Sequence, residues 1–434
     1  MDIVELSSAF TIFLPFDILF DHRIRKDSFL YSFLESTMMW AEEVISNGII
    51  PWLTPLGVYI HIPFCQHHCH YCDFAVTVGQ DDLISAYLDA LTIEITKLGR
   101  ITPVQTIFIG GGTPSYLPPK ELERLLRVIN HWLPAPEGVP REFSIEATPE
   151  SLTLEKIDML YQQGVTRISL GVQTFNEKFL PVLDRIHRPN HIFPVLEQLR
   201  RYPLQISLDL MFGLPGQTTA DWEKDLHQAL QQGTHHLSTY GLTYEKGTPL
   251  WKKWKKGDVI ACSEEEELEM YKQAILILQS ANWDHYEISN FAKGNTRCRH
   301  NELYWANYAY YGFGVGAASY VEGNRQMNKR NSADYIQTIM SGDSAIFQSE
   351  KLSDYDRAWE TIAIQLRRCE GINAITFAHQ TGFSLAELIG KVLESLEKLN
   401  LVQVTDQKIA LTEQGKPLAD SIIAQIMKEQ KEKY

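Results

Sequence analysis

The chain has 434 residues, which is enough for two or three domains of roughly 150 residues each and for a sizeable buried core. Its 40 basic and 54 acidic residues give a formal charge of −14, so a general attraction to nucleic acid or anionic lipid is not expected. Charged residues make up 22% of the chain beside an ordinary apolar content, which excludes a disordered chain. Six cysteines are too few for a secreted scaffold held by disulfides.

The N-terminal extension, residues 1–50, shows no clear periodicity, and its role stays open between a docked helix, a small lid and sequence upstream of the true start. Its most apolar run, residues 9–20, is interrupted by Pro15 and Asp17 and is preceded by acidic residues, unlike a signal peptide. No run is long enough to span a bilayer. We expect a cytoplasmic protein that is not an integral membrane protein and whose thiols stay reduced.

Six short β-branched runs alternate with amphipathic helical patterns from residue 58 onward. Such alternation is typical of an α/β fold with parallel strands, here an open (β/α)6 partial TIM-type barrel whose active site lies at the carboxyl ends of the strands. The expected strands are 58–62, 106–110, 142–146, 167–172, 205–211 and 236–242. The expected helices between them are 82–99, 119–132, 153–163, 176–200 and 219–231.

Helix-capping residues support these boundaries. Thr153 and Thr219 are expected to cap two of the helices, and Ser263 with Glu266 forms a capping-box pattern that starts a further helix. The basic and aromatic run at residues 251–256 is expected to be a solvated loop.

The C-terminal part of the sequence, residues 346–434, predicts a winged-helix-like domain. Residues 381–400 carry Glu387, Glu394 and Glu397 against Lys391 and Lys398, so this domain lacks a basic face. We expect packing or gating rather than DNA binding. The expected domains are the extension 1–50, the barrel 51–285, a linking region 286–345 and the winged domain. The expected elements of the last domain are helices at 354–369 and 384–399, a hairpin from 401–405 and 408–411, and a helix at 416–427.

Three cysteines lie within eight residues directly after the first expected strand: Cys65, Cys69 and Cys72. Three thiolates from one loop suit an iron–sulfur cluster with one vacant coordination position. There are two alternatives. One is a zinc site that recruits His67, His68 or His70 as a fourth ligand, and the other is a set of inert buried thiols.

Glycine and polar residues follow the other strands. Gly110, Gly111 and Gly112, followed by Thr113, end the second strand, where glycines let a ligand approach the backbone. Polar side chains also occur where apolar ones would be the simpler choice: Glu146 ends the third strand, Gln173 ends the fourth, and Asp209 lies in the fifth. Buried carboxylates need a partner or a ligand, so these side chains are expected to surround a polar cofactor. Arg185 is a candidate partner for a cofactor carboxylate, with a surface acid as the alternative partner.

These segments together resemble the radical S-adenosylmethionine superfamily, and within it the oxygen-independent coproporphyrinogen III oxidase-like family. The matching pieces are YIHIPFC at 59–65, GGGTP at 110–114, residues 145–146 and 171–173, LDLMFGLPGQT at 208–218, and Tyr240. The resemblance implies a 4Fe–4S cluster held by Cys65, Cys69 and Cys72, and cleavage of S-adenosylmethionine to a 5′-deoxyadenosyl radical. The S-adenosylmethionine contacts that it implies are Tyr59, Tyr71, Gly111, Gly112, Thr113, Glu146, Gln173, Arg185 and Asp209.

Two features indicate the heme chaperone (HemW) branch of that family. The oxidases carry a further cysteine two residues after the third cluster cysteine, and this chain has Phe74 there. The segment 300–305 matches the HNxxYW motif of the chaperones and makes His300 the heme candidate, with Cys298 or another histidine as alternatives. The resemblance implies a chaperone that hands heme to an acceptor heme protein, and we expect this acceptor to be a membrane heme enzyme. The rival function is radical oxidative decarboxylation of coproporphyrinogen III in porphyrin biosynthesis.

Overall fold

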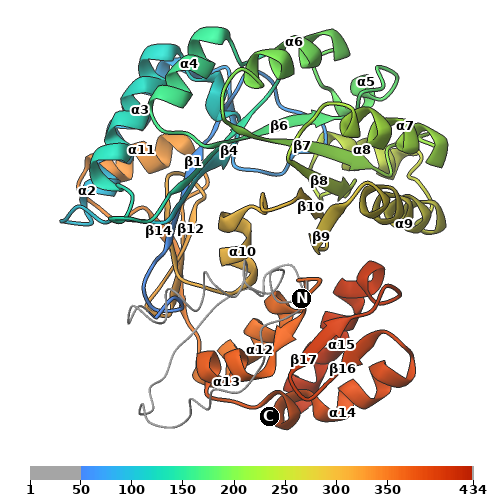
Figure 1. Ribbon diagram of the computed structural model, residues 1–434. Coiled ribbons are helices and arrows are strands. Elements are labelled where there is room, and N and C mark those ends of the chain that lie inside the picture. Colours follow the sequence, from blue (N-terminus) through green and yellow to red (C-terminus); the bar gives the residue numbers. More distant parts are fainter. Residues whose placement is uncertain (1–49, 433–434) are drawn as a thin grey trace.

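The computed structural model describes residues 50–432, so the prediction for the N-terminal extension lies outside the described residues. The chain forms a large α/β part and a C-terminal part of helices and short strands (Figure 1). Within the described stretch, no helix is both long enough and apolar enough to cross a membrane.

The six expected strands form and lie side by side in parallel, in chain order. Apolar side chains such as Ile107, Ile145 and Ile168 alternate along them and pack under the outer helices, because successive side chains of a strand point to opposite faces. The prediction of an open, partly closed barrel of parallel strands is confirmed. The strands are β1 (Gly57–Ile62), β4 (Thr106–Gly111), β5 (Glu142–Ala147), β6 (Arg167–Gln173), β7 (Gln205–Phe212) and β8 (His236–Gly241).

The sheet continues past both edges of the six strands and contains twelve strands among the described residues. Four of the additional strands continue from β1, of which β11 pairs with β1 in parallel, and two continue from β8. The sequence did not predict them because they are short and several are polar, as in NRQMN at Asn324–Asn328. They are β9 (Trp283–Glu287), β10 (Asn290–Lys293), β11 (Tyr310–Phe313), β12 (Ala318–Val321), β13 (Asn324–Asn328) and β14 (Ile346–Lys351).

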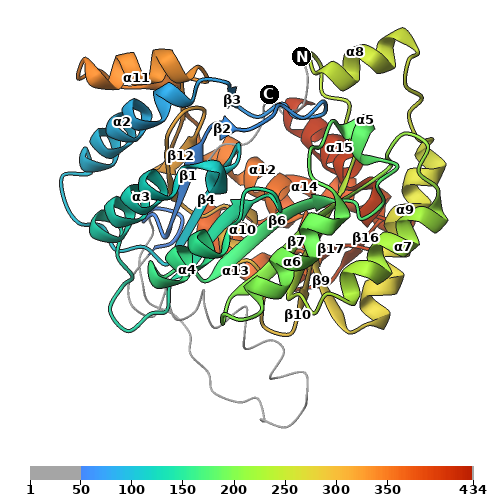
Figure 2. The ribbon, with the colours of Figure 1, turned by 90° about the horizontal axis from the view of Figure 1, so that it is seen from above.

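The helices form an outer layer over the barrel strands (Figures 1 and 2). Thr153 and Ser263 cap their helices as predicted, whereas the cap of α7 is Thr218, one residue before the predicted Thr219. Thr218 and Asp221 bond reciprocally to each other's backbone there, which moves the start of the helix. The outer helices are α2 (Ile84–Thr96), α3 (Pro119–Trp132), α4 (Leu154–Gln162), α6 (Pro189–Leu199), α7 (Thr219–Leu230), α9 (Glu264–Ser280) and α11 (Ser332–Met340).

Two helical predictions were wrong. The stretch 176–200 is not one helix: α5 (Leu180–Leu183) ends at Asp184, whose φ of 57° is left-handed, and α6 starts after a connecting segment. The basic and aromatic run is helix α8 (Pro249–Lys256) rather than a loop. Thr248 caps its start and Gly257, with a φ of 79°, ends it.

The C-terminal part has its own hydrophobic cluster, which includes Trp359, Ile389 and Ile409. Helices and a three-stranded sheet give it a winged-helix-like shape, with one short helix, α13, that the sequence did not predict. It contacts the barrel part through the Gln365 and Gln380 side-chain amides, which donate to the Ala306 carbonyl at 3.0 and 3.1 Å. The domain boundaries stay a proposal, which the separate cluster supports. The elements are α12 (Asp354–Gln365), β15 (Ile372–Asn373), α13 (Ala374–Thr381), α14 (Leu385–Lys398), β16 (Val402–Val404), β17 (Lys408–Leu411) and α15 (Ala419–Glu432).

Candidate functional site

The cysteine loop and the glycine segment lie against each other at the carboxyl ends of β1 and β4. Cys65 ends the short strand β2 (Phe64–Cys65), which pairs with β3 (Thr77–Val78), and its Sγ accepts a hydrogen bond from Thr113 Oγ1 at 3.5 Å. The Gly112 N–H donates to the Ile62 carbonyl at 2.8 Å. A Cβ on Gly112 would lie 2.6 Å from the Pro63 carbonyl oxygen and 2.8 Å from Cys65 Sγ. Only glycine therefore allows this close approach.

Arg185 connects the other side of the cysteine loop to the barrel. Its guanidinium donates to Cys69 Sγ at 3.5 Å and to the Gly171 carbonyl at 2.8 Å. Asp184, the residue before Arg185, accepts a hydrogen bond from His67 Nε2 at 2.6 Å, and its carboxylate lies 3.1 Å from His70 Nε2, within ion-pair distance. The segment between α5 and α6 that the sequence analysis took for helix thus holds the cysteine loop in place.

The three cysteines are free thiols, and Cys72 lies in the same loop as Cys69, its N–H donating to the Cys69 carbonyl at 3.2 Å. Burial raises the pKa of the Cys65 thiol to about 12 and that of Cys72 to about 11. Thiolates are the form that binds metal, so these buried thiols need an electropositive partner to ionise. Within residues 50–432 no three His, Cys, Asp or Glu side chains are arranged to hold a single ion. In a 4Fe–4S cluster each cysteine binds its own iron, and the sulfurs need not converge on one point.

Two carboxyl groups face the same space from neighbouring parts of the barrel. Glu146 Oε2 accepts a hydrogen bond from the Gly111 N–H at 3.0 Å, and Asp209 accepts from Ser169 Oγ at 3.0 Å. Burial, with repulsion from Asp209, raises the pKa of Glu146 to about 8. Burial also raises the pKa of Asp209, against hydrogen bonds from Ser169 and Ser238. Such a pair suits a cationic ligand with N–H or O–H donors, which would stabilise both carboxylates.

The remaining expected contacts border the same region. The Tyr59 hydroxyl lies 3.0 Å from His61 Nδ1, and the Tyr59 ring stacks on Phe108. Gln173 ends β6 with a left-handed φ of 67°, at a shift in the β6–β7 register. Tyr71 packs on an apolar cluster around α5 and α8, and burial raises its pKa. The three cysteines and most of the expected cofactor contacts thus lie at the carboxyl ends of the strands or in the segments that follow, while Tyr59 and Asp209 lie within β1 and β7 and line the same cavity as Glu146.

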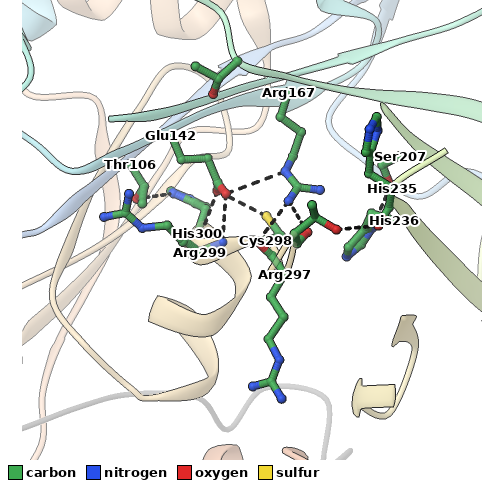
Figure 3. A network of polar contacts seen from close by, with 12 residues as sticks. Thr106, Glu142, Arg167, Ser207, His235, His236, Arg297, Cys298, Arg299 and His300 are labelled. Atoms are coloured by element: carbon green, nitrogen blue, oxygen red, sulfur yellow. Dashed lines mark hydrogen bonds and ion pairs between the residues drawn. The ribbon is translucent and has the colours of Figure 1, made fainter. Parts of the chain in front are cut away.

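His300 lies at the opposite end of the barrel, on α10 (Arg299–Trp305). Its side chain is fully buried, with Nδ1 2.9 Å from Thr106 Oγ1 and Nε2 2.9 Å from the Tyr304 hydroxyl. Burial lowers its pKa to about 3, so the ring is neutral at physiological pH. Thr106 begins β4, which places His300 at the amino ends of the strands, beside Thr106 and Glu142 (Figure 3), whereas the three cysteines of the loop follow the carboxyl end of β1.

A cavity of about 250 Å³ runs through the barrel between these two ends. Phe74 and Tyr240 line its outer part, Glu146 and Asp209 its middle, and His300 its floor. The polar residues that line the cavity near the amino ends of the strands were not predicted as site residues, although their spacing along the strands pointed to them. Polar residues recur at every second position of β5, β6, β7 and β8, and one face of each strand points inward. They are Glu142, Ser144, Glu146, Arg167, Ser169, Ser207, Asp209, His236, Ser238 and Tyr240.

Comparison with known proteins identifies the domains. Residues 59–229 match the model of the Radical SAM superfamily, and residues 352–418 match the HemN C-terminal domain. A Radical SAM domain carries a 4Fe–4S cluster and S-adenosylmethionine. The three free thiols can supply the sulfur ligands of such a cluster, and Gly112 and the paired carboxyl groups of Glu146 and Asp209 fit a polar cofactor beside it.

Relatives of known name cover most of the chain. The chain is 37% identical to "Heme chaperone HemW" of Bacillus subtilis over 378 residues, which are 86% of this chain and 99% of the relative. It is 36% identical to "Heme chaperone HemW" of Synechocystis, over 74% of this chain and 80% of the relative. The solved structure of coproporphyrinogen III oxidase (HemN) from Escherichia coli matches with a TM-score of 0.76 at 24% identity, over 86% of this chain and 90% of that chain. This last match bears on the fold alone.

Proposed function

The chain belongs to the family of the heme chaperone HemW, and from this premise we propose that it binds heme and passes it to an acceptor heme protein. We further propose that the acceptor is a membrane heme enzyme and that the chain works in the cytoplasm. The acidic charge of −14 supports a protein partner rather than nucleic acid.

We assign the cofactor site as follows. Cys65, Cys69 and Cys72 hold the cluster, and Arg185 orients the loop through Cys69. Glu146 and Asp209 face the cationic and hydroxyl-bearing parts of S-adenosylmethionine, and when bound the two cofactors supply one-electron chemistry. The other assigned contacts are Tyr59, Tyr71, Gly111, Gly112, Thr113, Gln173 and Arg185.

The observation that carries the heme proposal is the position of Phe74. Its side chain is 67% exposed and lines the mouth of the cavity beside the cysteine loop. Tyr240, 42% exposed, lines the same mouth. Exposed aromatic rings offer flat apolar surface to a macrocycle, whereas the oxidase branch places a cysteine at position 74.

Heme ligation by His300 would require a rearrangement of the barrel floor. Both ring nitrogens already make hydrogen bonds, and the side chain is fully buried. An iron ligand would have to replace one of these bonds. We therefore propose that His300 positions α10, and that the heme iron takes another ligand near the mouth of the cavity.

The test is to reconstitute the cluster without oxygen and titrate the protein with heme, following the Soret band. The same preparation is then given coproporphyrinogen III, S-adenosylmethionine and a reductant. A saturable heme spectrum without protoporphyrinogen formation is the expected result. Protoporphyrinogen formation without a stable heme complex would instead establish the rival function, oxidative decarboxylation.

A further inference from the structure

Arg167, the first residue of β6, lies in the floor of the barrel with unused hydrogen-bond donors. Its side chain is 1% exposed and lines the cavity. Nη2 donates to the carbonyls of Thr296 and Arg297, at 2.5 and 3.0 Å (Figure 3). Nε and Nη1 have no hydrogen-bond partner among the described residues. A buried donor without a hydrogen bond destabilises the folded protein, so these two nitrogens indicate that an acceptor is missing.

The ion pair with Glu142 does not give these two Arg167 nitrogens a hydrogen-bond acceptor. Arg167 Nε lies 3.6 Å from Glu142 Oε2, beyond a hydrogen bond. The Glu142 oxygens instead accept from the backbone N–H groups of Arg299 and His300, each at 3.0 Å, and from Cys298 Sγ at 3.5 Å. The hydrogen-bonding capacity of the Glu142 oxygens is thus used mainly at the start of α10.

A second unused donor lies next to Arg167. Ser144 on β5 is fully buried, is paired in register with Arg167, and its Oγ has no hydrogen-bond partner among the described residues. The cavity beside Arg167 is also lined by the aromatic rings of Tyr59 and Phe108. The Arg167 guanidinium thus lines the cavity below an apolar wall, and the Ser144 hydroxyl is the unused donor beside it on the neighbouring strand.

From this geometry we propose that the floor of the barrel cavity binds the carboxylate of a small organic acid, with its oxygens on Arg167 and Ser144. The volume of about 250 Å³ admits only a short molecule. Glu146 and Asp209 line the same cavity and Glu142 Oε2 lies 3.6 Å from Arg167 Nε, so a monoanion is preferred to a dianion such as phosphate. The site lies at the amino ends of the strands, in the same cavity as the assigned cofactor contacts Glu146 and Asp209, and it shares the Tyr59 ring with them; it does not depend on whether the chain carries heme.

Calorimetric titration of the cluster-reconstituted protein with sodium propionate, against sodium chloride at equal ionic strength, tests the proposal. We expect saturable binding at one site, tighter for propionate than for acetate because the methylene group contacts the aromatic wall. Ser144→Ala is expected to weaken binding roughly tenfold, since it removes one hydrogen bond to a charged group. Arg201→Gln, which removes an exposed arginine, serves as the matched control and is expected to bind as the unmodified chain does.

Arg167→Lys is expected to abolish measurable binding, because a lysine lacks the guanidinium donors. Ser144→Ala keeps all the Arg167 contacts, so it decides the matter if Arg167→Lys does not fold. Absence of saturable propionate binding would overturn the proposal. Binding that Ser144→Ala leaves unchanged, or inorganic phosphate binding as tightly as propionate, would overturn it as well.

Discussion

The guanidinium of Arg185 donates a hydrogen bond to the thiol of Cys69 across 116 residues of sequence, at 3.5 Å. The same guanidinium donates to the Gly171 carbonyl at the end of β6. One side chain therefore joins the cysteine loop to the barrel strand that ends beside it. This link sets the distance between the expected cluster and the residues assigned to S-adenosylmethionine.

Replacing Arg185 by methionine is predicted to weaken S-adenosylmethionine binding roughly tenfold or more, because charge-assisted hydrogen bonds are lost. Iron content after reconstitution should stay close to that of the unmodified chain, since the three thiols remain. The change that S-adenosylmethionine causes in the electron paramagnetic resonance signal of the reduced cluster measures the affinity. Unchanged affinity would show that Arg185 acts on the loop alone; Arg201→Met is the surface control.

Gly112→Ala is predicted to prevent stable cluster assembly. The new Cβ would lie 2.8 Å from Cys65 Sγ and 2.6 Å from a backbone oxygen that cannot move freely. Iron and sulfide analysis after anaerobic reconstitution is the measurement. Gly390→Ala is the matched control, because a Cβ there, on α14, meets nothing within 4 Å. Full iron content in Gly112→Ala would contradict the close approach of the two loops.

The free energy of unfolding of the cofactor-free protein is predicted to contain a pH-dependent contribution from Glu146. Its pKa rises on folding from its ordinary value near 4.5 to about 8, so the folded state binds the proton more tightly. This contribution is fully present below about pH 4.5 and is lost as the pH rises through 8. Glu146→Gln should therefore gain stability relative to the unmodified chain between these values.

Urea denaturation of both proteins at intervals from pH 5 to pH 9 checks this prediction. The difference in unfolding free energy between Glu146→Gln and the unmodified chain should grow with pH across the window. Buried acids that do not interact with Glu146 titrate alike in both proteins and cancel in the difference, whereas Asp209, which repels Glu146, contributes to it. A difference that does not vary with pH would mean that the Glu146 carboxylate is already compensated in the folded protein.

Phe74→Ala is predicted to weaken heme binding about tenfold while it changes the unfolding free energy by less than about 0.5 kcal/mol. The side chain is 67% exposed and contributes little to the core, so a loss of affinity would report on the surface itself. Heme titration and urea denaturation are the two measurements. Phe347→Ala, which removes a 75% exposed ring on β14, is the control. Equal affinities of the two variants would remove Phe74 from the heme surface.

His300→Ala is predicted to destabilise the protein by about 2–4 kcal/mol, because it leaves Thr106 and Tyr304 without their buried partner and opens a cavity. Heme affinity should stay within about twofold. The exposed His131→Ala serves as the control for both measurements. A heme complex that loses its axial-ligand spectrum in His300→Ala would return this residue to the heme site.

Local sequence determined the parts of this protein that depend on neighbouring residues. The proposed cluster ligands could be chosen from the sequence because Cys65, Cys69 and Cys72 share one loop and cluster ligation requires close spacing. The six barrel strands were predictable because their apolar side chains alternate with a period of two. The break between α5 and α6 at Asp184 was not predictable, since a left-handed residue at the end of a short helix leaves no strong pattern in the sequence.

Only the tertiary structure decided which distant residues meet. The barrel brings Arg185 to Cys69, and it pairs Arg167, which lines the cavity, with Ser144 on the neighbouring strand. It also placed His300 at the closed end of the barrel, whereas its motif alone suggested a heme ligand. The physical reason is that a strand's period shows which residues share a face, but closure of the sheet determines what that face encloses.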